Sequence, residues 1–235
     1  MRAASGRASQ PEMILEMKYT VIHAGYPGDS SSAMLRRMEH DVLRHKPDTV
    51  VVECGANDAV NPAALNSLEN YSDNLRKIAA RIAEAGADLL FMTPPPVYAP
   101  EMIVRYKFNQ PADTDLNAVL DRYVQAMRDV AALLDKPLLD VSKILHVVGN
   151  VGPGKDSLVR NEANSGVKDG AHLTEEGYRL LAALVYQALL DHRLAGRCIV
   201  CFGDSITHGY PLAGMGTLEG NNYPAVLNRL LNTEP

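Results

Sequence analysis

Short apolar runs alternate with stretches of helical periodicity along most of the chain. Four of these runs are rich in leucine or β-branched residues: YTVIHAG (19–25), TVVVECG (49–55), DLLFMTP (88–94) and PLLDVS (137–142). Continuous apolar runs of this length are typical of strands that are covered on both faces. We therefore expect four strands in a sheet with helices on both sides.

Apolar residues at three- and four-residue spacing predict helices between these strands. One helix is expected over 68–82, with Gly86 as its stop, and a second over 116–134. A third is expected from Thr174, a good N-cap that two glutamates follow, to about Leu190. The alternation of strands and helices predicts an α/β fold in which a central parallel sheet lies between two helical layers.

The last forty residues add one more strand and one more helix. The run CIVCF (198–202) is the most uniformly apolar in the chain, and a helix is expected over 223–231. Since the inner strands of a doubly wound sheet are the most buried, we expect this late strand inside the sheet. Cys198 and Cys201 form a C-x-x-C motif, but strand geometry turns them to opposite faces, so we expect two ordinary buried cysteines.

Composition narrows the class of protein. The chain has 235 residues with 46% apolar content, which favours one compact domain over 1–235. Its net charge of −5 is spread among interspersed residues, which argues against nucleic-acid or membrane partners and favours a small neutral ligand. We find neither a signal peptide nor a membrane span, so a cytoplasmic location is expected unless a leader was removed. Oligomeric state is not predicted, and no sequence motif indicates a metal or a nucleotide cofactor.

Candidate chemistry follows several of the strands. Ser205 comes after the late strand and a Gly203 turn, which would expose its hydroxyl at the carboxyl edge of the sheet. A serine hydroxyl is a weak nucleophile without a base, so a histidine must reach it. A Gly-Asp-Ser turn is common in proteins, so this motif alone does not establish a catalytic site.

Four short motifs together resemble one enzyme family. GDSITHG (203–209), Gly28 in AGYPGDS, GAND (55–58) and DGAH (169–172) are similar to the four blocks of the SGNH, or GDSL-type, hydrolases. In that family the nucleophile block comes first, whereas here it comes last. The sequence therefore resembles a circularly permuted member in which 198–235 supplies the first strand and helix of the family.

The resemblance implies a flavodoxin-like three-layer fold with about five parallel strands, and a serine esterase that needs no cofactor. It implies Ser205 as nucleophile, His172 as base and Asp169 as the group that orients the base. It also implies an oxyanion hole made by the backbone N–H groups of Ser205 and Gly28 and the side chain of Asn57. Oxyanion donors must be fixed before the reaction, and both glycine and asparagine suit that task.

The motifs are compatible with several classes of ester substrate. A short-chain acyl ester, such as an acetyl group on a carbohydrate, is the first expectation, with two long loops, 147–168 and 212–222, shaping the pocket. Longer acyl chains, thioesters and acyl transfer to an alcohol use the same residues. A non-catalytic binding module is the alternative of a different class, and the presence of both a base and its orienting carboxylate favours the enzyme.

Several other polar residues are expected to have structural roles. His23 lies in a strand run and is expected in the core or behind the site, while His208 and Tyr210 are expected beside a pocket. Asp58 and Asp204 are expected to hold loops through backbone hydrogen bonds. Glu53 lies on a buried strand and needs a partner, which the sequence does not identify.

Overall fold

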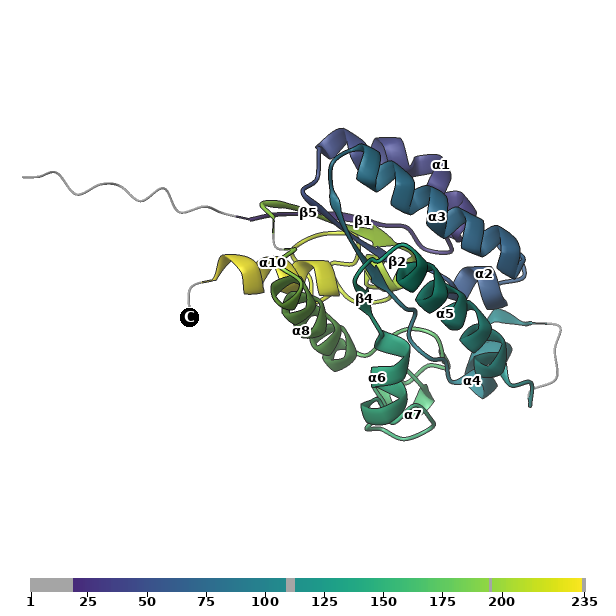
Figure 1. The fold of residues 1–235 in the computed structure, drawn as a ribbon. Coiled ribbons are helices and arrows are strands. Elements are labelled where there is room, and N and C mark those ends of the chain that lie inside the picture. Colours follow the sequence, from purple (N-terminus) through teal and green to yellow (C-terminus); the bar gives the residue numbers. More distant parts are fainter. Residues whose placement is uncertain (1–18, 109–112, 195, 234–235) are drawn as a thin grey trace, which may run out of the picture.

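A five-stranded parallel sheet forms the centre of the computed structural model, which describes residues 19–108, 113–194 and 196–233. Every neighbouring pair of strands is parallel. From one edge to the other, the strands are β1 (Thr20–Gly25), β5 (Cys198–Gly203), β2 (Thr49–Glu53), β3 (Asp88–Met92) and β4 (Leu138–Leu139). The late strand therefore lies inside the sheet, as predicted (Figure 1).

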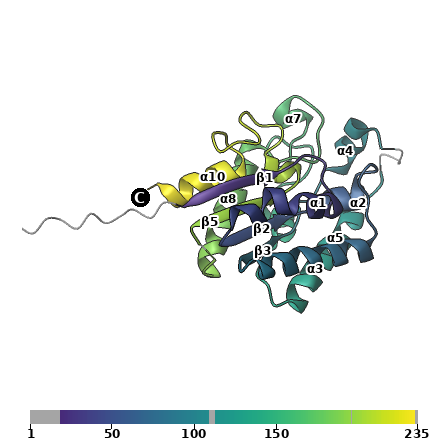
Figure 2. The ribbon, with the colours of Figure 1, turned by 90° about the horizontal axis from the view of Figure 1, so that it is seen from above.

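Two helical layers cover the sheet (Figures 1 and 2). One layer consists of α1 (Ser31–Asp41), α3 (Leu68–Glu84) and α5 (Leu116–Leu133). The other is built on α8 (Glu175–Asp191) and α10 (Tyr223–Asn232). Strand residues alternate between the two: Val50 and Val52 pack in the core under α1, α3 and α5, whereas Val51 packs in the core under α8 and α10.

Shorter helices complete the described chain. They are η1 (Leu43–His45), α2 (Ala56–Val60), α4 (Ala99–Tyr106), α6 (Val141–Val148), α7 (Glu162–Ser165) and α9 (Ser205–His208). The α2 and α9 helices begin just beyond the carboxyl ends of β2 and β5. Across the described residues, no helix combines the length and the apolar character needed to cross a bilayer.

The helices expected from periodicity are present. The Thr174 hydroxyl caps α8 by accepting a hydrogen bond from the N–H of Gly177 at 3.1 Å. The α3 helix ends at Glu84, and Gly86 follows with a φ of +75°, a value that favours glycine. The expected strand at 137–142 is shorter, because Asp140 caps a new helix, α6, by accepting from the N–H of Lys143.

The sequence predicts that both cysteines of the late strand are buried, and the structure confirms this for Cys201 but not for Cys198. Ile199, Val200, Cys201 and Phe202 are fully buried. Cys198 is only half-buried, because it is the first residue of the strand and lies next to the exposed Arg197. The three cysteines, Cys54 among them, are all free thiols.

The α10 helix lies against β1, although the two are far apart in the sequence. The Asn232 side chain accepts a hydrogen bond from the N–H of Tyr19 at 2.9 Å and donates one to its carbonyl at 3.1 Å, across 213 residues. Leu227 of α10 and Val21 of β1 belong to the same buried cluster. The segment after β5 therefore packs beside the segment that leads into β1.

Candidate active site

Ser205 lies at the carboxyl edge of the sheet, where β5 gives way to α9. Asp204 caps α9 by accepting a hydrogen bond from the N–H of Ile206 at 2.8 Å. Gly203 is required at the turn, because a Cβ there would overlap the Thr207 side chain and the Glu53 carbonyl oxygen. As the first residue of α9, Ser205 has no acceptor for its N–H within the helix, and its hydroxyl faces a cavity.

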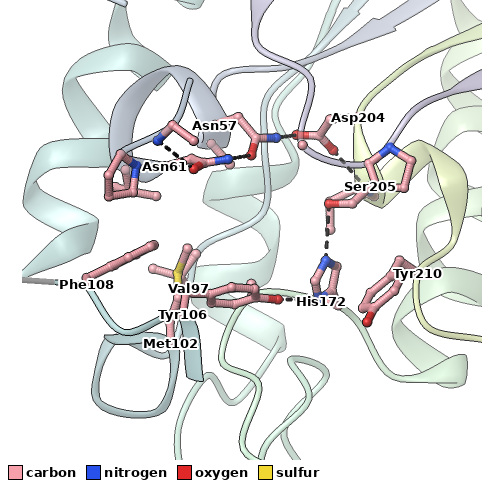
Figure 3. Close-up of a pocket in the computed structure, with 18 of the residues that line it drawn as sticks. Asn57, Asn61, Val97, Met102, Tyr106, Phe108, His172, Asp204, Ser205 and Tyr210 are labelled. Carbon is pink, nitrogen blue, oxygen red and sulfur yellow. Dashed lines mark hydrogen bonds between the residues drawn. The ribbon is translucent and has the colours of Figure 1, made fainter. Parts of the chain in front are cut away.

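His172 reaches this hydroxyl from the segment before α8. Its Nε2 lies 3.1 Å from the Ser205 Oγ (Figure 3). On the other side of the ring, Nδ1 lies 2.9 Å from the Asp169 Oδ1. The structure therefore joins Ser205, His172 and Asp169, which come from two separate sequence motifs, in one hydrogen-bonded chain.

Asp169 is buried and well supplied with hydrogen-bond donors. Its Oδ1 accepts from the backbone N–H groups of Ala171 and His172, each at 3.0 Å, so the carboxylate fixes the turn as well as the ring. Burial alone would raise the pKa of Asp169, but the hydrogen bonds from the His172 ring and backbone and from Ala171, with the attraction of His172, hold it at about 2. The carboxylate is thus charged at neutral pH and holds the imidazole in place.

Gly28 and Asn57 line the same cavity as Ser205 and His172. Gly28 follows β1 with a φ of +84°, and since a Cβ would contact nothing there, its backbone conformation is what favours glycine. The Asn57 Nδ2 donates to the Asp204 Oδ2 at 2.8 Å, and its Oδ1 accepts from Asn61 at 2.9 Å (Figure 3). One of the two N–H groups expected for the oxyanion is therefore already used, and within the described part of the chain no acceptor binds the other.

Two tyrosines flank His172. The Tyr106 hydroxyl, from the end of α4, lies 3.3 Å from the His172 Nδ1. Burial, followed by the charge of Asp169, raises the pKa of Tyr106 to about 12, so the phenol stays protonated. The Tyr210 ring lies with its centroid 4.7 Å from that of His172. The sequence predicts Tyr210 beside a pocket, whereas the contact of Tyr106 with His172 depends on where α4 packs.

The other polar residues singled out in the sequence lie outside the hydrogen-bonded chain of Ser205, His172 and Asp169. Asp58 holds the start of α1, as predicted, by accepting from the backbone N–H and hydroxyl of Ser31. His208 lines a second, smaller cavity with His23, whose ring lies edge-on to it at 5.5 Å. Within the described ranges, no three His, Cys, Asp or Glu side chains cluster in a way that would hold a metal ion.

The cavity beside Ser205 has a volume of about 450 Å³. Figure 3 shows Phe108, Val97 and Met102 on one side of it and the Ser205–His172 pair on the other. Most of its exposed wall is apolar, and the polar residues that line it include Asn57, Asn61, Lys107 and His172. Such a site combines a hydrophobic binding surface with a few fixed polar groups.

The low pKa of Asp169 predicts a pH-dependent contribution to stability. Because the pKa is about 2 in the folded state and near 3.8 in the unfolded chain, the charged form stabilises the fold by about 2 kcal/mol above pH 4, and this is lost as pH falls from about 4 to about 2. We expect Asp169→Asn to lower the free energy of unfolding in urea by about that amount at pH 7 and by less at pH 3. The exposed Asp73→Asn is the control, and an Asp169→Asn deficit that stays constant with pH would contradict the assignment.

Comparison with known proteins places the chain in a family. Residues 3–180 match the model of the GDSL-like lipase/acylhydrolase family; Gly28, Asn57, Asp169 and His172 lie inside this span and Ser205 lies after it. An arylesterase of Vibrio mimicus is 33% identical over 87 residues, which cover 35% of this chain and 40% of that protein. Esterase TesA of Pseudomonas aeruginosa is 33% identical over 87 residues, 36% of this chain and 42% of that protein. The chain thus matches about two fifths of the length of these curated relatives.

Solved structures share the fold. A lipase/acylhydrolase from Enterococcus faecalis superposes with a TM-score of 0.55 at 26% identity, covering 71% of this chain and 73% of that one. The acetyl xylan esterase AlAXEase also gives a TM-score of 0.55, at 20% identity, covering 71% and 79% of the two chains. Since the family model matches well over half of the sequence, the chain belongs to the GDSL-like lipase/acylhydrolase family.

Proposed function

We propose that the protein is a serine esterase that cleaves carboxylic esters through an acyl-enzyme on Ser205. The observation that carries this proposal is the hydrogen-bonded chain from the Ser205 Oγ through His172 to Asp169, at 3.1 and 2.9 Å, beside a cavity. In the proposed reaction the Ser205 oxygen attacks the ester carbonyl while the His172 Nε2 takes the hydroxyl proton. His172 then gives that proton to the departing alcohol, and a water molecule, activated in the same way, releases the acid.

The negative charge on the tetrahedral intermediate needs donors that are already in position. We infer that the backbone N–H groups of Ser205 and Gly28 and the free N–H of Asn57 supply them. All three residues line the cavity and follow the carboxyl ends of β5, β1 and β2, which are adjacent strands. This arrangement supports one anion-binding point beside the nucleophile.

We infer that the substrate carries an apolar group larger than acetyl. A cavity of about 450 Å³ with mostly apolar walls lies within the size range of sites that hold whole small molecules. An acyl chain of about eight carbons, or an aryl ring, would bury apolar surface there. For an acyl chain, each buried CH₂ group stabilises binding by about 0.8 kcal/mol. A short acetyl ester on a carbohydrate remains the second candidate, favoured by the fold shared with acetyl xylan esterases.

We also propose that the family blocks occur here in cyclically shifted order within one domain over 1–235. Counting the strands from β5 gives the sheet order 2-1-3-4-5, which is the flavodoxin-like order. The hydrogen bonds between Asn232 and Tyr19 lie where a connection from the first helix to the second strand would run in that order. The match of the family model to residues 3–180, ahead of Ser205, supports the same reading.

Removal of the nucleophile tests the mechanism directly. We expect Ser205→Ala to lower kcat for p-nitrophenyl butyrate by at least about a thousandfold, because the remaining groups have no oxygen to activate. Ser72→Ala on α3 is the control for a serine outside the cavity and should keep its rate. If circular dichroism shows that Ser205→Ala is folded and the variant keeps its activity, Ser205 is not the nucleophile.

Chain length tests the size of the acyl pocket. We expect kcat/KM to rise from p-nitrophenyl acetate to butyrate to octanoate, because each added CH₂ group is buried in the cavity. Ala63→Phe, at the cavity wall, should lower the octanoate value more than the acetate value, by about tenfold if two CH₂ groups are excluded. A preference for acetate that Ala63→Phe leaves unchanged would favour the short-chain candidate.

Re-permutation tests the order of the blocks. A chain in which residue 233 is linked to residue 19 and the 192–197 segment is opened has the order of the family. We expect it to fold and to keep esterase activity within about tenfold, because the new link joins neighbouring points and His192 and Arg193, where the segment begins, are exposed. A protein that fails to fold after both changes, although the opened segment alone is tolerated, would count against the proposed equivalence.

A further inference from the structure

Glu53, the last residue of β2, is a buried acid that the proposed mechanism does not use. Its side chain is fully buried. Oε2 accepts a hydrogen bond from the Thr207 hydroxyl at 3.4 Å, whereas no described donor group reaches Oε1. An ionised carboxylate in such a place would be strongly destabilised, so this group requires a partner.

That partner is a second carboxyl group, Asp204, which directly precedes Ser205. The parallel pairing of β2 and β5 sets Val52 beside Phe202, which brings Glu53 to the turn that Asp204 begins. Thr207, the donor to the Glu53 Oε2, lies in the same turn. Asp204 is also buried, and its charge raises the pKa of Glu53. Among the described residues, neither acid forms an ion pair with a Lys, Arg or His side chain. Two buried like charges in contact repel strongly, so a hydrogen bond between these groups requires one of them to be protonated.

The surroundings decide which acid holds the proton. Asp204 accepts from two N–H groups, that of Ile206 on Oδ1 and the side-chain amide of Asn57 on Oδ2, each at 2.8 Å. Glu53 has only the distant hydroxyl of Thr207. Burial and then the charge of Asp204 raise the pKa of Glu53 well above its usual range; burial also raises that of Asp204, but its N–H donors oppose the rise. The negative charge therefore resides on Asp204.

The geometry points to Glu53 as a protonated positioning residue, whose O–H donates to Asp204 so that Asp204 can hold Asn57 and the first turn of α9 around Ser205. Asp204 contacts the chain on both sides of the nucleophile, since it directly precedes Ser205 and its side chain accepts a hydrogen bond from the N–H of Ile206. The Asn57 amide is fixed between Asp204 and Asn61, which aims its remaining N–H. The inference rests on the proposed esterase function, because it concerns alignment of the oxyanion donors.

Substitution of Glu53 tests this role through kcat and KM measured separately. We expect Glu53→Leu to lower kcat for p-nitrophenyl butyrate by about tenfold or more with KM within about twofold, because a misaligned oxyanion donor affects the transition state and not binding of the ester. Glu53→Gln, whose amide N–H can replace the acid O–H, should recover most of the loss. Thr49→Val is the control on the same strand, since it removes a buried hydrogen bond to Leu194 far from Ser205 and should leave kcat unchanged.

Infrared spectroscopy tests the proton itself, independently of activity. The difference spectrum between the unsubstituted protein and Glu53→Gln at pH 7 should contain the carbonyl stretching band of a protonated carboxyl group. Absence of that band would overturn the inference. Because the infrared measurement does not use Glu53→Leu, it still tests the proton on Glu53 if that variant fails to fold.

The two proposals fail in different ways. A folded Glu53→Leu variant with unchanged kcat, beside an inactive Ser205→Ala variant, overturns the positioning role and leaves the esterase function standing. Activity that survives Ser205→Ala overturns the esterase function. The infrared band then shows separately whether Glu53 carries a proton that it donates to Asp204.

Discussion

The position of β5 between β1 and β2 is the constraint on which the site depends. Parallel strands end at the same edge of the sheet, so the turns after these three strands bring Gly28, Asn57 and Ser205 to one point. Moving β5 to another position would separate Ser205 from both candidate oxyanion donors. The strand is held there by full burial of Ile199 through Phe202 and by pairing on both sides.

Buried acids are tolerated here in different ways, and the differences follow from the available donors. Asp169 is charged because two backbone N–H groups and the His172 ring surround it. Asp58 accepts hydrogen bonds from Ser31 and Asn66, so it holds a loop without an ion pair to any described cation. Glu53 has almost no donors, and a proton takes their place. The number of donors thus separates structural carboxylates from one that we expect to be neutral.

Much of the sheet and of the candidate site could be predicted from the sequence, because the signals are local. Uniformly apolar runs ending in glycine identify the strands, and Asp169 with His172 forms a compact motif just before a capped helix. The contact between Tyr106 and His172 could not be predicted, since it depends on where α4 packs. The partner of Glu53 was equally hidden, because only the parallel pairing of β2 and β5 brings Asp204 to it.

The pairing of β5 with strands from the first quarter of the chain also bears on how the protein folds. β5 begins at Cys198, whose N–H binds the Asp48 side chain across 150 residues. On a ribosome, β1 and β2 are made long before the strand that must separate them, so their edges stay unpaired while most of the chain is synthesised. Contacts over such distances are slow to form, and exposed strand edges invite pairing with other chains. We therefore expect the site to be one of the last parts of the molecule to form.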